Sequence, residues 1–119
     1  MLTKKNRADK KLIKDIFKDG KFINSPNISL KFVKKKDISL RISFITPKTV
    51  SKRAVDRNLL RRRGYDILGK NLYLFPKNFV GAFIFGKESM KFFGGRKNKK
   101  RNPFQNLENE IKKILNKIN

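Results

Sequence analysis

Apolar residues recur along the chain at the spacing of one helix face in its first segment. A helix is predicted from Asp9 to about Asp19, with Asp9 as its N-cap and Gly20 in the left-handed position that ends it. The apolar face of this helix comprises Leu12, Ile13, Ile16 and Phe17. This face is expected to pack on the rest of the domain.

Strict alternation of apolar and polar residues marks two later segments, 27–33 and 40–45, as half-buried strands. The charged stretch from Lys34 to Asp37 has the length of a hairpin turn, so the two strands are expected to pair with each other. A third segment, Phe79 to Gly86, is apolar at both alternating sets of positions. Such a strand is buried on both faces, and we predict that it lies inside the sheet.

Two further helices are predicted in the second half of the chain. The middle one runs from about Lys52 to Leu68 and ends at Gly69, with Gly64 as a weak point inside it. In the last one, Asn102 is the N-cap, Pro103 lies in the first turn and Gln105 completes a capping box. Its apolar stripe is expected to join the core and consists of Leu107, Ile111, Ile114, Leu115 and Ile118.

The predicted order of elements is α-β-β-(β)-α-β-α, where the bracketed strand is optional. This order is typical of the α+β class, with a small mixed β-sheet packed by helices. A chain of 119 residues with 38% hydrophobic residues can bury one modest core. We therefore expect a single domain over residues 1–119 that contains a glycine-led basic loop at 92–102.

The charge of the chain changes this picture of an ordinary small domain. Thirty-two Lys and Arg face nine Asp and Glu, which gives a net charge of +23. Such a domain repels itself unless a polyanion neutralises it, so a nucleic acid is the natural partner. The chain has no His, which is the commonest general base, and no Cys. Both residue types are also common metal ligands. No catalytic residue and no metal site are therefore expected in the protein itself.

Two simpler explanations of the positive charge are a compositional bias and binding to a membrane surface. A lysine excess together with Asn and Ile is partly a compositional bias, but that bias does not explain the arginines. Binding to an anionic membrane surface would need a free apolar helix face, and the predicted stripes are all used by the core. No apolar run approaches the roughly 20 residues that span a bilayer, and the N-terminus lacks the apolar core of a signal peptide. A cytoplasmic location is expected.

The arginines are concentrated in AVDRNLLRRR, residues 54–63, within the middle helix. At 100° per residue, Val55, Leu59, Leu60 and Ile67 are expected to face the sheet. The other half of the helix carries Arg53, Arg57, Asn58, Arg61, Arg62 and Tyr65. Guanidinium groups on successive turns lie about 6 Å apart and make bidentate bonds to phosphate, while an asparagine can read a base edge or a 2′-hydroxyl. The alternative is a solvated helix face, but the nearby acids do not match the arginines in number.

AVDRN followed by RR, and preceded by PKTVSKR, resembles the signature of the protein subunit of bacterial ribonuclease P. The order of the flanking segments also resembles that family. They are LIKDIFKDGKF for its first helix, ISLKFV and RISFITPK for strands before the signature, and NFVGAFIFG for the strand after it. The resemblance covers about residues 2–86 and the final helix.

The resemblance implies an RNA catalyst that removes the 5′ leader of precursor tRNA by magnesium-dependent hydrolysis, with Mg²⁺ bound mainly by the RNA subunit. The protein would then be an accessory subunit, inactive and monomeric when alone. The resemblance also implies a left-handed crossover between parallel strands, which the general handedness rule does not predict.

Site residues follow from the same resemblance. The motif that binds the catalytic RNA corresponds to Arg57, Asn58, Arg61 and Arg62, with Lys48, Lys52 and Arg53 as neighbouring phosphate contacts. The cleft that takes the single-stranded leader corresponds to Ile13, Phe17 and Lys31. The chain departs from the family pattern at Leu59 and Tyr65, where basic residues are usual, and at Ile13 and Lys31, where aromatic residues are usual.

A structural RNA-binding protein of the ribosomal type shares this size, charge and lack of a protein active site, and it is the alternative reading. The joint presence of an Arg-Asn helix and a separate helix with Phe17 and Gly20 favours ribonuclease P. A DNA-compacting protein would show dimer heptads or flexible β arms, and the sequence has neither.

Overall fold

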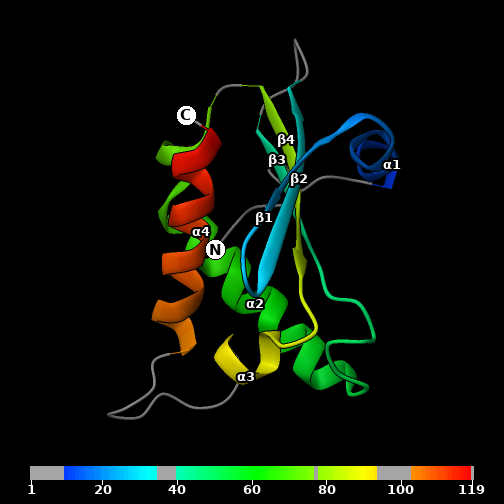
Figure 1. The fold of residues 1–119 in the computed structure, drawn as a ribbon, viewed down its shortest axis with the longest axis vertical. Helices are drawn as coiled ribbons and strands as arrows, with labels where there is room; N and C mark the ends of the chain where they lie inside the picture. The colour runs from blue at the N-terminus through cyan, green and yellow to red at the C-terminus, as the bar shows by residue number, and fades with distance from the viewer. Residues whose placement is uncertain (1–9, 35–39, 77, 94–102, 119) are drawn as a thin grey trace.

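The computed structural model describes residues 10–34, 40–76, 78–93 and 103–118. A four-stranded sheet separates the first helix from the other helices (Figure 1). The elements are α1 (Lys10–Asp19), β1 (Lys21–Asn24), β2 (Ile28–Lys34), β3 (Arg41–Ile45), α2 (Ala54–Lys70), η2 (Leu72–Leu74), β4 (Phe79–Phe85), α3 (Ser89–Phe93) and α4 (Pro103–Ile118). The predicted caps Asp9 and Asn102 and most of the basic loop lie outside the described residues.

The sheet has the order β1-β2-β4-β3, in which β4 is antiparallel to β2 and parallel to β3. The predicted central position of β4 is confirmed. The predicted hairpin between β2 and β3 is wrong, because β4 lies between them. Six of the seven residues of β4 are buried, so this strand gains most from having a neighbour on each side. The chain crosses from β3 to β4 through α2, and the left-handed sense of this crossover stays a prediction from the resemblance.

The edge strand β1 was not predicted, because the optional strand of the predicted order stands after the two predicted strands and β1 precedes them. Its four residues are mostly exposed and carry too little alternation to be recognised from the sequence. The turn that joins it to β2 is held from a distance by Glu110 of α4, whose carboxylate accepts hydrogen bonds from Ser25 Oγ at 2.7 Å and from Asn27 N at 2.8 Å and Nδ2 at 3.1 Å. This β1–β2 turn therefore depends on a helix more than 80 residues away in sequence.

The main core lies between the sheet and α2, α3 and α4, and phenylalanine rings dominate it. Phe44 of β3 stacks on Phe83 and Phe85 of β4, with ring centroids 5.1 and 5.5 Å apart. The predicted apolar stripe of α4 is confirmed, because four of its five residues are buried there and Ile118 packs against them. On the other face of the sheet, α1 buries Ile16 against Val80 and Ala82.

Gly20 directly follows the last residue of α1 as predicted, but not in the left-handed conformation, and Gly69 and Gly64 have roles other than the predicted ones. Gly69 lies inside the last turn of α2, which ends instead at Asn71, where the backbone N–H bonds to Leu68 O at 3.0 Å. Gly20 does not adopt a positive φ; it is needed because a Cβ there would collide with the carbonyl oxygen of Ile16. Gly64 is buried, and a Cβ on it would lie 2.7 Å from the ring of Phe44. The absence of a side chain at Gly64 therefore lets α2 approach the sheet closely.

Replacing Gly64 by alanine is expected to destabilise the protein by about 1–2 kcal/mol. Overpacking of a tight core costs about 1–3 kcal/mol, while alanine gains up to about 1 kcal/mol in helix propensity. Urea unfolding of the variant and the wild type measures the difference. A variant that is more stable than the wild type would mean that Phe44 can move aside and that helix propensity decides.

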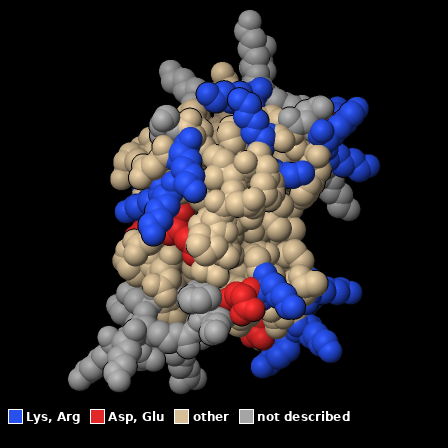
Figure 2. Space-filling model, viewed as in Figure 1, with Lys and Arg blue, Asp and Glu red and all other residues tan. Residues whose placement is uncertain are grey.

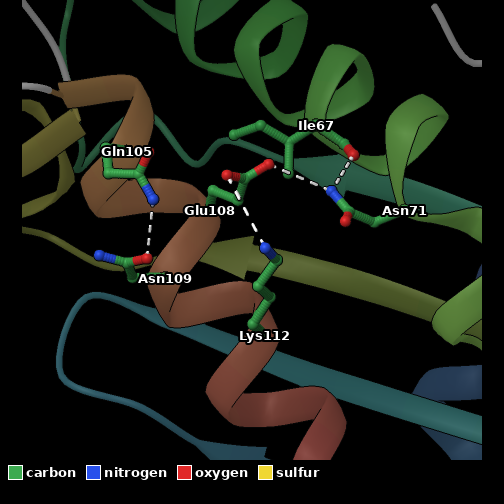
Figure 3. A network of polar contacts seen from close by, with 6 residues as sticks. All are labelled: Ile67, Asn71, Gln105, Glu108, Asn109 and Lys112. Atoms are coloured by element: carbon green, nitrogen blue, oxygen red, sulfur yellow. Dashed lines mark hydrogen bonds and ion pairs between the residues drawn. The ribbon is translucent and has the colours of Figure 1, made fainter.

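Asn71 joins the end of α2 to α4 (Figure 3). Its side-chain Nδ2 donates to Ile67 O at 2.8 Å and to Glu108 Oε2 at 3.2 Å, and the residue is only 5% exposed. Glu108 also lies 4.0 Å from Lys112 Nζ, one turn further along α4. A buried amide thus satisfies a carbonyl at the helix end and a carboxylate on the neighbouring helix at the same time.

The substitution Asn71→Asp is expected to lower the free energy of unfolding by about 2–3 kcal/mol at neutral pH. It removes both donors and places a second carboxylate beside Glu108 and the negative end of the α2 dipole. Asn109→Asp is the matched control, because Asn109 is exposed and, among the described residues, its side chain only accepts one hydrogen bond, from Gln105 to its Oδ1. Equal urea midpoints for the two variants would contradict this role of Asn71.

Candidate nucleic-acid interface

The first half of α2 carries the arginines and projects past the core. The buried residues of α2 are Leu60, Gly64, Ile67 and Leu68, so no residue before Leu60 is buried. Figure 1 shows the helix running obliquely away from the sheet toward its N-terminal end. The core therefore contacts mainly the second half of the helix, and the residues of the N-terminal turns are exposed or half-buried.

The predicted division of α2 into two faces is wrong at three positions. Leu59, expected to face the sheet, is only half-buried and lines a surface groove instead. Val55, expected to face the sheet, is 64% exposed, because the sheet does not extend beneath the first turns. Tyr65, expected on the basic face, packs edge-on against Phe44 at 5.2 Å, and its hydroxyl oxygen accepts a hydrogen bond from Phe44 N at 3.2 Å. The buried face is thus rotated toward the arginines relative to the predicted one.

The arginines assigned to the RNA motif lie at the edge of the buried face or point away from it. Arg62 is exposed, while Arg57 and Arg61 are half-buried. Arg57 Nη1 donates to Ser51 O at 2.8 Å, and Arg61 Nη2 donates to Asn58 Oδ1. Within the described residues, none of these three guanidinium groups pairs with a carboxylate. Most of their donors therefore remain available to an external acceptor.

Lys48, Lys52 and Arg53 are exposed in the segment that leads into α2. A turn closed by Val50 N and Pro47 O at 3.0 Å folds this segment back, and Ser51 Oγ accepts from Arg53 N at 3.2 Å. The structure thus brings all seven residues of the predicted set to one end of the molecule. Figure 2 shows basic side chains gathered at the lower right, where Figure 1 places the N-terminal half of α2.

Arg63 differs from its neighbours. Its Nη1 donates to Phe93 O at 2.6 Å, which ties α2 to the end of α3. Partial burial lowers the pKa of Arg63 from its ordinary value by desolvation, although the guanidinium stays charged. Arg63 is therefore a positioning residue for the chain just before the basic loop rather than part of the exposed row.

A second group of residues lies on the opposite face of the sheet, beside α1. Lys31 Nζ is 4.9 Å from the ring centroid of Phe17 and 5.8 Å from that of Phe22, so the ammonium contacts two aromatic rings. The two rings are 44% and 48% exposed. Ile13 is half-buried on the same helix as Phe17. Two exposed aromatic rings joined by a cation form a surface that suits single-stranded nucleic acid.

Phe22 was missed in the sequence analysis. It lies in β1, where the strand itself was not recognised, and the register pairs it directly with Lys31. Residues paired across antiparallel strands project from the same face of a sheet, so Phe22 has to lie beside Lys31 once β1 exists. The sequence itself shows only an aromatic residue between Lys21 and Ile23, and this alone does not predict a binding role.

The ribonuclease P family model matches residues 2–119. The chain belongs to the ribonuclease P protein family. Proteins of this family are accessory subunits of an RNA-based endoribonuclease that matures the 5′ end of tRNA, and this chain is such a subunit. The family match covers nearly the whole chain, so it replaces the alternative of a ribosomal structural protein.

Solved structures of ribonuclease P proteins have the same fold. The RNase P protein from Thermotoga maritima is 23% identical, with a TM-score of 0.79 over 95% of this chain and 97% of that chain. The Staphylococcus aureus RNase P protein is 15% identical, with a TM-score of 0.73 over 93% of this chain and 92% of that chain. No curated protein sequence matches this chain. The predicted α+β class with a mixed sheet is confirmed.

Metal ligands and membrane spans complete the description of this ribonuclease P protein. The described residues contain no group of three or more Asp, Glu, His or Cys side chains that could hold a metal ion. Every helix in the same part of the chain is too short or too polar to traverse a lipid bilayer.

Proposed function

We propose that the N-terminal half of α2, together with the segment before it, binds the ribonuclease P RNA. The residues involved are Arg57, Asn58, Arg61 and Arg62, with Lys48, Lys52 and Arg53 as phosphate contacts. The observation that carries the proposal is that Arg57, Arg61 and Arg62 gather on a projecting helix end without a carboxylate partner among the described residues. Guanidinium groups in that state bind phosphate oxygens at little desolvation cost.

The leader of precursor tRNA is proposed to bind on the α1 side of the sheet, at Ile13, Phe17 and Lys31, with Phe22 as an addition from the structure. A base that stacks on either ring places its phosphate near Lys31, because the ammonium lies within 6 Å of both ring centroids. Every base has a face that can stack, so such a surface binds leaders of different sequence. The two proposed RNA surfaces lie on opposite faces of the sheet (Figure 1).

Magnesium is proposed to act in the RNA subunit. The described part of the protein offers no cluster of oxygen ligands of the kind that Mg²⁺ needs, and Mg²⁺ is commonly held by phosphates. The protein then contributes positive charge and positioning, as a monomer when alone, and works in the cytoplasm. No step of the hydrolysis is assigned to a protein side chain.

A pull-down followed by reconstitution tests this function. The tagged protein is expected to co-purify one dominant structured RNA, and that RNA with the protein should cleave precursor tRNA at its 5′ end in the presence of Mg²⁺. The protein alone should leave the precursor intact. Co-purification of ribosomal RNA instead, with no gain in cleavage when the protein is added to the ribonuclease P RNA, would contradict the proposal.

A further inference from the structure

An open groove with both polar and apolar side chains in its lining lies on the projecting half of α2. It has a volume of about 320 Å³ and is lined by Val55, Asp56, Asn58, Leu59 and Arg62. Val55 and Leu59 are one helical turn apart, so their side chains form one aliphatic strip. Within the described part of the chain, neither belongs to the buried core or to the residues packed against it, although Leu59 is half-buried. The described core therefore does not account for this aliphatic strip on a chain with a net charge of +23.

The rim of the groove carries polar groups with defined roles. Asn58 Oδ1 accepts from Arg61, and arginine has only donors, so the amide oxygen faces Arg61 and the NH₂ group points elsewhere. This NH₂ group has no hydrogen-bond partner among the described residues. Arg62 is exposed beside it, and Asp56 accepts from Ser51 Oγ at 3.0 Å. The groove thus combines an aliphatic floor with a donor, a cation and a carboxylate.

We propose that this groove seats one unpaired nucleobase of the ribonuclease P RNA, an inference that rests on the proposed function of α2. The face of the base would lie on Val55 and Leu59 and exclude water from them. The Asn58 NH₂ group would donate to a ring nitrogen or carbonyl at the edge of the base, since all four bases carry such acceptors. Arg62 would bind the phosphate next to that nucleotide.

Asp56 decides between a base and a phosphate as the occupant of the groove. A carboxylate in the lining repels a phosphate but accepts a hydrogen bond from an amino or imino group of a base. The base is therefore expected in the groove and the backbone outside it, on the arginine side. The surrounding positive charge favours a polyanion over a neutral protein partner.

Leu59 completes the aliphatic strip with Val55. Apolar contact between this strip and a base does not release counterions, so it contributes affinity that is insensitive to salt.

The double variant Val55→Ala, Leu59→Ala tests the inference. Alanine keeps the helix, Val55 is exposed and the half-buried Leu59 lies outside the core of the described residues, so the melting temperature should change little. Binding of the ribonuclease P RNA, titrated over a series of salt concentrations, is expected to weaken about tenfold with an unchanged salt slope, since only apolar burial is lost. Tyr73→Ala is the matched control, because Tyr73 is 79% exposed and lies beyond the opposite end of α2, and this variant should bind as the wild type does.

Chemical modification of base edges in the bound RNA gives a second readout. At least one unpaired base should be protected by the wild-type protein and reactive with the double variant, while protection of the backbone persists. If the double variant binds with wild-type affinity and leaves the modification pattern unchanged, the proposal that a base binds in the groove is wrong. A loss of affinity accompanied by a smaller salt slope would also contradict it. If Arg57→Ala with Arg61→Ala still weakens assembly in that case, only the groove inference fails. If the arginine variant has no effect either, the proposed function of α2 fails with it.

Discussion

Replacing Arg57 and Arg61 together by alanine is expected to weaken assembly with the ribonuclease P RNA by about 3–5 kcal/mol. Each guanidinium group is expected to make charge-assisted hydrogen bonds to phosphate, because neither is paired with a carboxylate among the described residues. Loss of two phosphate contacts should also reduce the slope of log K against log salt by about two units. Titration of the RNA at several salt concentrations measures both quantities.

A control must separate these contacts from the loss of positive charge in general. Lys113→Ala with Lys117→Ala also removes two positive charges, but from a different helix, α4, on which both side chains are exposed. This variant should change the affinity and the slope much less than the arginine variant does. Equal effects of the two double variants would mean that the RNA responds only to net charge, and the assignment of α2 would fail.

Helices and strands with strong periodicity were predictable because the spacing of their apolar residues indicates which side chains are buried. The stripe of α4 lies in the core as the pattern indicated, and six of the seven residues of the doubly apolar β4 are buried. The hairpin error has a different origin, since alternation shows that a segment is a strand but not which strand is its neighbour. The strand β4 is buried and pairs on both edges, so it lies between β2 and β3. The local alternation within β2 or β3 does not indicate this arrangement.

For the candidate sites, the sequence indicated residues but not their geometry. The arginine cluster indicated α2 as the candidate RNA-binding helix, yet the rotation of its buried face depends on how far the sheet extends beneath it. Val55, Leu59 and Tyr65 were therefore assigned to the wrong sides. Phe22 required knowledge of β1, whose turn is held by Glu110 from the last helix. A contact between residues so far apart in sequence follows only from the complete fold.

Removal of both exposed rings beside Lys31, by Phe17→Ala with Phe22→Ala, is expected to cost about 2–5 kcal/mol in the affinity of the assembled enzyme for precursor tRNA. Stacking contributes about 1–3 kcal/mol per base, and both rings are exposed and outside the core. The affinity for mature tRNA, which has no leader, should stay nearly unchanged. Equilibrium binding of the two substrates to wild-type and variant holoenzymes measures the difference.

Lys31→Gln separates stacking from charge at the same surface. It should lower the salt slope for precursor binding by about one unit, whereas the double phenylalanine variant should weaken binding at an unchanged slope. This difference is expected because Lys31 supplies the cation between the rings, while the rings themselves contact the faces of the bases. If the phenylalanine variant instead loses equal affinity for precursor and mature tRNA, these rings do not bind the leader. In that case they contact the body of the tRNA or support the assembly of the enzyme.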